Sequence, residues 1–298
     1  MSLSWANLVS TNQLLVFLGA DDVAVIHQSQ GLRNRVIDQK QVTFPVSIEG
    51  IKIEAPVWQQ STIQLERLLS AMQLQPGTRL TITLASEFVR YLSLPALQIR
   101  MNATEKLAYI AAAYQDIYGE VVNDWEINCH DAPSEEAILA AAIDKKLLAE
   151  LNQIALKHQL ILHSVQPYLM RAFNALASQI NDTNGYLVLV ESKRLLLINL
   201  QDRKYQNLRT YAVGDGDNWQ SELKNLMLRE ALLSNFNKQE TDKQEIDKHE
   251  IDKQEILVYA PTQKNIALKV IDGWHLKRIS TLKNVITNIQ YSMLEVSL

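Results

Sequence analysis

The sequence predicts an α/β fold with mixed sheets, built as two lobes of similar design. Each half of the 298-residue chain begins with a run of short strand patterns and continues with helical patterns that alternate with further strands. Hairpins followed by crossover connections give mixed sheets flanked by helices. A polar stretch at 181–185 separates the two series. A chain of this length is long enough for each half to bury a core of its own.

The N-terminal half opens with strands. The apolar run over 14–28 is interrupted at Gly19 and the acidic residues after it, so we expect a hairpin there. Two further strands are expected over 35–44 and 48–53. These segments together predict an antiparallel meander.

A helix and another strand follow the meander. Ser61 or Thr62 is the expected N-cap of the helix, because a hydroxyl side chain there precedes apolar residues spaced three or four apart. The helix is expected to end at Pro76-Gly77. A strand over 80–84 comes next and leads into a polar corner.

The chain re-extends after this corner. We expect a strand over 88–94, which Pro95 ends. Thr104 is the expected cap of a helix that stops at Gly119, and a strand is expected over 121–129.

Periodicity alone reads 133–160 as one long helix. A strand over 160–165 and a helix over 166–180 complete the half. Hence the first half is expected to combine a meander with alternating helices and strands.

The C-terminal half repeats this order. The expected strands lie at 186–190, 195–199, 209–213, 256–259 and 275–279. One helix is expected from Asp217, which is spaced from Gln220 as in a capping box, and a closing helix is expected over 281–293.

A charged repeat with a five-residue period occupies 238–255 and reads KQETD-KQEID-KHEID-KQE. Five residues advance a helix by about 500°, so successive isoleucines fall on different faces and no coiled coil is expected. Two interpretations stay open: a solvated helix extension or loop, which is usual for such runs, and a contact with a partner.

The composition excludes several function classes. The net charge is −4, from 29 basic and 33 acidic side chains, which does not favour nucleic-acid binding. A single cysteine excludes an intrachain disulfide and fits a reducing compartment. The N-terminus lacks the pattern of a signal peptide, and 18 consecutive apolar residues occur nowhere, so we expect no direct membrane insertion and a cytoplasmic protein.

Few residues suggest chemistry. Cys129-His130 lacks the further ligands that zinc needs, and no partner that would activate the thiol is indicated. Asp215-Gly216-Asp217 lacks the later acidic ligands of a calcium loop and fits a turn before a helix. We therefore expect no catalytic residue and no metal site.

Two groups of residues within 80–180 form a recognisable pattern. The first group is Leu84, Ser86, Phe88, Arg90, Leu94, Pro95, Gly119, Glu120 and Trp125. The second group is Ala142-Ile143-Asp144, Leu148, Leu151, Leu160, Ser164-Val165 and Pro167-Tyr168-Leu169. In these residues the chain resembles a known family, the actin-like cytoplasmic proteins of type IV pilus and type II secretion machines (PilM, MshI and the cytoplasmic GspL relatives). The resemblance covers this stretch well and the remainder only by the order of elements. This chain has Ala96 where the relatives commonly have tryptophan.

The resemblance implies a two-lobed actin-like, ribonuclease H-like duplicated fold. The implied lobes are 1–180, with an inserted subdomain at about 86–135, and 181–298, with the charged repeat as an insertion at 238–255. It also implies a strand over 137–143 in place of the first part of the long helix. Asp144 would then cap a separate helix, a role that suits its side chain.

Actin-like folds usually hold ATP between their lobes with glycine-containing turns whose N–H groups bind phosphate. This chain departs from that pattern in all three turns. No hydroxyl follows Gly19, the turn at Glu191-Ser192-Lys193-Arg194 has no glycine, and Ala260-Pro261 stands where a Gly-Gly pair is expected. We therefore expect no nucleotide cofactor.

The resemblance thus implies a non-catalytic cytoplasmic scaffold, peripheral at the inner membrane through a protein partner. That partner would be a membrane-anchored pilus or secretion assembly protein, or an assembly ATPase, and a homodimer is also compatible. Arg90 and Tyr91, at a strand end, are the candidate partner-binding residues; structural roles are the competing interpretation. The alternatives are a divergent actin-like nucleotide-binding protein, an ATPase or kinase, and an interaction protein unconnected to pili.

Overall fold

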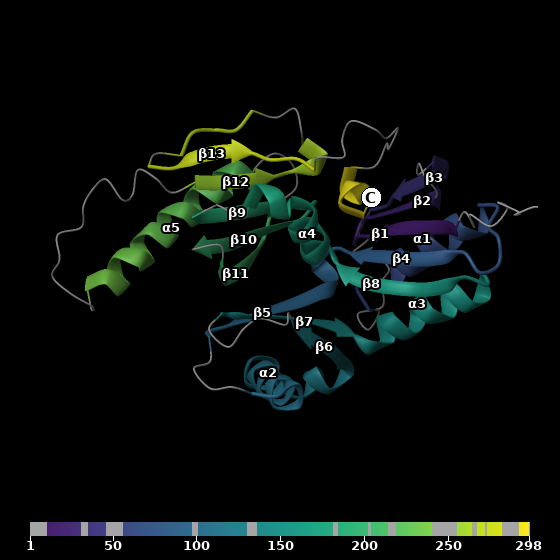
Figure 1. The fold of residues 1–298 in the computed structure, drawn as a ribbon, viewed down its shortest axis with the longest axis horizontal. Coiled ribbons are helices and arrows are strands. Elements are labelled where there is room, and N and C mark those ends of the chain that lie inside the picture. Colours follow the sequence, from purple (N-terminus) through teal and green to yellow (C-terminus); the bar gives the residue numbers. More distant parts are fainter. Residues whose placement is uncertain are drawn as a thin grey trace, which may run out of the picture.

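The computed structural model describes most of the chain (Figure 1). The described residues are 11–30, 35–45, 56–96, 101–129, 136–180, 184–201, 204–213, 219–239, 255–263, 267–271, 273–281 and 292–297. They form two five-stranded mixed sheets, a three-stranded sheet and flanking helices, which confirms the predicted α/β class with mixed sheets.

The first five-stranded sheet has the order β3-β2-β1-β4-β8. Its strands are β1 (Thr11–Leu18), β2 (Asp22–Gln30), β3 (Arg35–Thr43), β4 (Arg79–Leu84) and β8 (Ile161–Pro167). The first three strands form an antiparallel meander, while β4 runs parallel to both β1 and β8. This sheet and its helices are called the first lobe below.

The second sheet has the equivalent order, β11-β10-β9-β12-β13. Its strands are β9 (Gly185–Val190), β10 (Arg194–Gln201), β11 (Lys204–Ala212), β12 (Glu255–Tyr259) and β13 (His275–Arg278). Again three antiparallel strands precede two parallel ones. The repeated order and directions confirm the duplication, and this sheet with its helix is the second lobe.

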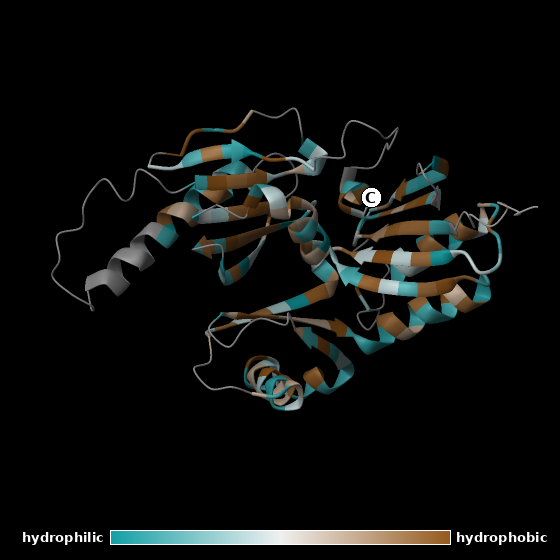
Figure 2. Ribbon diagram, in the orientation of Figure 1, coloured by the Kyte–Doolittle hydropathy of each residue, from teal (hydrophilic) through white to brown (hydrophobic). Residues whose placement is uncertain are grey.

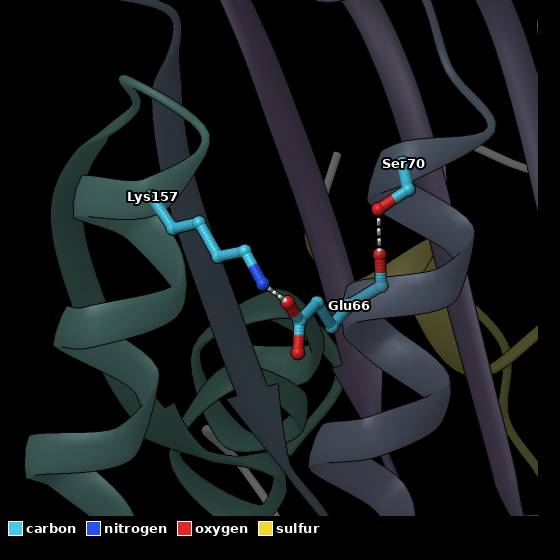
Figure 3. A network of polar contacts seen from close by, with 3 residues as sticks. All are labelled: Glu66, Ser70 and Lys157. Carbon is cyan, nitrogen blue, oxygen red and sulfur yellow. Dashed lines mark hydrogen bonds and ion pairs between the residues drawn. The ribbon is translucent and has the colours of Figure 1, made fainter.

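Alternating side chains give each sheet two buried faces, and the central strands are mainly hydrophobic (Figure 2). On the outer face of the first sheet lie α1 (Gln59–Ser70) and α3 (Lys145–Lys157), which share one core with Leu14, Val16 and Leu18. An ion pair between Glu66 and Lys157 links these two helices (Figure 3). In the second lobe, α5 (Trp219–Gln239) covers the corresponding face.

A core between the lobes joins the two inner faces. It takes side chains from β1 and β2 of the first lobe and from β9, β10 and β12 of the second. Two further segments complete it: α4 (Tyr168–Ile180) and the 3₁₀ helix η6 (Ser292–Ser297). Leu176 and Leu294, one on each segment, are fully buried. The lobes therefore share one continuous apolar core.

The third sheet has the order β5-β7-β6 and packs on α2. Its elements are β5 (Val89–Leu94), α2 (Ala103–Tyr118), β6 (Trp125–Cys129) and β7 (Ile138–Asp144). Its central strand, β7, lies after residue 135, where the inserted subdomain is predicted to end. The domain boundaries stay a prediction. An ion pair of 3.8 Å between Glu136 and Lys204 links this region to the second lobe.

Asp144 confirms the implied separation of strand and helix. The chain forms β7 up to this residue, and its carboxylate accepts a hydrogen bond of 2.8 Å from the Lys146 N–H at the start of α3. The reading of 133–160 as a single helix is therefore wrong.

Two expected caps are also wrong. Ser61 lies inside α1, and its buried hydroxyl donates to the Gly19 carbonyl 2.7 Å away. The Thr62 hydroxyl donates to the Gln59 carbonyl and does not cap the start of the helix. Asn102, not Thr104, caps α2 and forms a reciprocal capping box with Glu105.

Two expected boundaries shift because of strand pairing. β6 begins at Trp125 opposite Asp144, where β7 ends, and the preceding segment forms the 3₁₀ helix η2 (Gly119–Asp124). Gln166 pairs with Thr83 in the first sheet, so α4 begins only at Tyr168.

Several predictions fall outside the described residues. They are the strand at 48–53, the cap at Asp217, residues 240–254 of the charged repeat, and most of the closing helix at 281–293.

Candidate functional site between the lobes

A pocket of about 300 Å³ lies between the two lobes. The turns that were compared with nucleotide-binding loops contribute to its wall, together with the corner after β4 and the C-terminal segment. Its lining residues are Phe17, Gly19, Ala20, Asp21, Asp22, Ala85, Glu87, Glu191, Ser192, Thr262, Gln263 and Met293. The structure therefore brings together the turns that the sequence comparison singled out.

The first turn, between β1 and β2, is closed by its own polar groups. The Gly19 N–H donates to the Asp22 carbonyl at 2.8 Å, and the Asp21 carbonyl accepts from Phe44 N–H at 2.8 Å. A Cβ placed on Gly19 would lie 2.1 Å from an Asp22 carboxylate oxygen. The position beside Gly19 is thus taken by a carboxylate, which repels a phosphate.

The second turn, between β9 and β10, contacts the first. The Ser192 hydroxyl donates to the Asp21 carboxylate at 3.2 Å, and the Lys193 ammonium lies 3.5 Å from the same oxygen. Within the turn, the Glu191 N–H donates to the Arg194 carbonyl at 2.9 Å. Lys193 of this turn therefore pairs with a carboxylate of the other lobe.

Glu191 is the most unusual residue of the site. Its side chain is only 4% exposed, and it accepts hydrogen bonds from the backbone N–H of Ser86, at 2.8 Å, and from the Ser86 hydroxyl. Burial, followed by the nearby Glu87 carboxyl, raises the pKa of Glu191 to about 8 despite these hydrogen bonds. Burial also raises the pKa of Glu87.

The third turn follows β12. Ala260 leads into the 3₁₀ helix η4 (Pro261–Gln263) rather than into a glycine pair. The Gln263 side-chain oxygen accepts a hydrogen bond from the Trp219 indole, and the Gln263 backbone carbonyl accepts one from the Arg278 guanidinium at 3.1 Å. This turn is occupied by contacts within the second lobe.

The residues around the pocket do not fit ATP. The four carboxyl groups of Asp21, Asp22, Glu87 and Glu191 line it, and the one lysine of these turns pairs with Asp21. Nor do the described residues contain a cluster of three or more His, Cys, Asp or Glu side chains that could hold a metal ion. Cys129 is half-buried, while His130 and 215–217 lie outside the described residues.

The two candidate partner-binding residues diverge in orientation. The Arg90 guanidinium is exposed and donates to the Glu87 carbonyl at 3.1 Å. Tyr91 packs against the cores of the first lobe and of the lobe interface, and its hydroxyl lies 3.4 Å from that of Ser86. Burial raises the pKa of Tyr91. Partner binding by these residues stays a prediction; Arg90 is exposed, whereas Tyr91 is only partly exposed.

A second, smaller pocket of about 150 Å³ lies beside Arg90. It is formed by the residues just before α1, the corner after β4 and the third sheet, and it is lined by Pro56, Val57, Trp58, Glu87, Phe88, Arg90, Trp125, Ala142 and Asp144. The Trp58 indole donates to the Asp144 carboxylate at 3.1 Å, which fixes one wall. Sequence reasoning gave no signal for this pocket, since its walls come from segments far apart in the chain.

Among the described residues, no helix has the length and apolar character needed to cross a membrane.

No family model matches the chain, and no curated protein matches it. Solved structures do. The cytoplasmic domain of EpsL, an inner-membrane component of the type II secretion system of Vibrio cholerae, is 13% identical with a TM-score of 0.51, over 91% of this chain and 90% of that one. The PilM–PilN type IV pilus biogenesis complex gives 12% identity and a TM-score of 0.55, over 90% and 88%.

A protein of unknown function from Bacteroides thetaiotaomicron, described as having an actin-like ATPase fold, gives 9% identity and a TM-score of 0.53 over 93% of this chain and 94% of that chain. Identities this low establish a shared fold and nothing finer. They agree with the duplicated sheet order and with the resemblance found in the sequence. This chain therefore has the two-lobed actin-like fold seen in PilM-type and EpsL-type proteins.

Proposed function

We propose that this protein is a non-catalytic cytoplasmic scaffold of a pilus or type II secretion-like assembly. The observation that carries the proposal is the pocket between the lobes, where carboxyl groups occupy the positions that would have to bind phosphate. The likeness to EpsL and to the PilM–PilN complex supports an assembly role. The lobes would be 1–180, with the insertion near 86–135, and 181–298, with the insertion at 238–255.

The partner would be a membrane-anchored assembly protein or an assembly ATPase, and would hold the scaffold at the inner membrane. The pocket beside Arg90 is the place we propose for its docking. Exposed Val57 and the rings of Trp58 and Trp125 offer apolar contacts there, and the Arg90 guanidinium offers N–H donors for a carboxylate. Tyr91 would support this surface from inside, and a homodimer is compatible with it.

Replacing Arg90 with alanine is expected to weaken binding of the partner at least tenfold with little change in stability, because Arg90 is exposed. Crosslinked pull-down from cells identifies the partner, and titration with it measures the affinity. The control is Arg67→Ala, which removes a different exposed arginine, on α1, and should bind the partner normally. Unchanged affinity with lowered stability would make Arg90 structural, and recovery of no inner-membrane protein would count against the assembly role.

Mg-ATP is expected to leave the melting temperature unchanged. A ligand present at a hundredfold excess over its Kd adds about 2.7 kcal/mol to the free energy of unfolding, an effect that a thermal melt detects easily. Melting the protein with and without millimolar Mg-ATP is therefore decisive. A clear rise would favour the alternative function, a divergent actin-like nucleotide-binding protein.

A further inference from the structure

The hydrogen bonds between Glu191, which lines the pocket, and Ser86 join the two lobes beside it. Glu191 directly follows β9 of the second lobe, and Ser86 begins the 3₁₀ helix η1 (Ser86–Phe88) after β4 of the first. Both residues are almost completely buried, at 4% and 2% exposure. One carboxyl group thus holds a backbone N–H and a hydroxyl of the opposite lobe.

We propose that Glu191 and Ser86 form a latch that holds the two lobes together at the pocket between them and that loosens when Glu191 loses its proton. The neutral carboxyl satisfies this geometry well. One oxygen accepts the Ser86 N–H, and the other shares a proton with the Ser86 hydroxyl, whichever of the two groups donates. The buried carboxylate, in contrast, brings an unneutralised charge into a site of low polarity.

The charged and titratable groups around the latch come from every element that packs there. Glu87 on η1 opposes a negative charge on Glu191, and the Tyr91 phenol on β5 lies near the same carboxyl. Arg194 at the start of β10 favours the charge. Lys193 and Asp21 are paired with each other across the lobes. Burial together with Glu87 outweighs Arg194, so the closed form favours the protonated carboxyl.

The direction of the pH effect follows from the difference between the closed and open forms. The pKa of Glu191 is about 8 in the closed form and returns toward its ordinary 4.5 when the lobes part at this pocket, with their shared core intact, and water reaches the carboxyl. The closed form therefore binds the extra proton. Its advantage is complete below pH 4.5 and is lost as pH rises to about 8, with the open-to-closed ratio increasing about tenfold per pH unit in between.

The test measures the distance between the lobes as a function of pH in the full chain. Spin labels or fluorophores are attached to Arg67→Cys on α1 and Ser221→Cys on α5, both exposed positions, with Cys129→Ser removing the native thiol. We expect the distance to lengthen from pH 5 to pH 9 in the otherwise unchanged protein. With Glu191→Gln, a neutral side chain of the same shape, it should stay short throughout.

Two further variants separate the latch from its surroundings. Glu87→Gln should keep the transition but make it smaller and end it at a lower pH, because loss of the neighbouring charge lowers the closed-form pKa of Glu191 while its open-form pKa stays the same. Ser86→Ala should lengthen the distance already at pH 5. A constant distance in the unchanged protein, or the same pH dependence in Glu191→Gln, would overturn the proposal. So would loss of the transition in Glu87→Gln alone.

Discussion

Gly185→Ala is expected to lower the free energy of unfolding by about 2 to 6 kcal/mol. Gly185 begins β9 with a φ of +148°, a conformation that side-chain-bearing residues rarely adopt. A Cβ there would lie 2.1 Å from the carbonyl oxygen of Glu255, its partner on β12. The strained conformation costs about 1–3 kcal/mol. Forcing the strand backbones apart costs about 1–3 kcal/mol more.

Gly77→Ala provides the matched control. Gly77 also has a positive φ, of +81°, but its Cβ would meet no atom within 4 Å. Its cost should be limited to the conformational part, about 1–2 kcal/mol. Equilibrium unfolding in guanidinium chloride measures both variants. Equal losses would show that the approach of Gly185 to β12 is unimportant for stability.

Leu176→Ala is expected to cost about 2–5 kcal/mol, because it leaves a cavity in the core shared by the lobes. The Leu176 side chain lies on α4 and has no exposed surface. Both residues have high helix propensity, so the loss comes from packing and not from the backbone.

Leu156→Ala makes the same chemical change on α3, where the side chain is 67% exposed, and should change stability by less than about 0.5 kcal/mol. Chemical denaturation of both variants gives the comparison. Similar losses of stability in the two variants would contradict the conclusion that α4 is tightly packed between the lobes.

The sequence predicts the repeated order of strands and helices along the chain well because this order depends on local patterns. Apolar runs and polar turns mark the strands of both meanders, and the hairpin at Gly19 is confirmed. Boundaries were less predictable where distant partners decide them. Ser61 resembles a helix cap in the sequence, but its hydroxyl bonds the carbonyl of Gly19, 42 residues away.

The site between the lobes was predictable only in part. The three turns could be compared with nucleotide-binding loops, and the lack of the needed residues was visible in the sequence. The hydrogen bonds between Ser86 and Glu191 were not, because 105 residues separate the two and each has an ordinary local role, at a corner and at a turn. Only the packing of the lobes makes them neighbours.

The shared core also has a consequence for how the molecule loses its structure. Side chains from both five-stranded sheets, α4 and η6 are buried against one another, so neither lobe could melt while leaving the other's inner face covered. Separating the halves would expose a large apolar surface on each. The duplicated architecture should therefore behave as a single cooperative unit, in which the two similar halves are made dependent on each other by the surface they share.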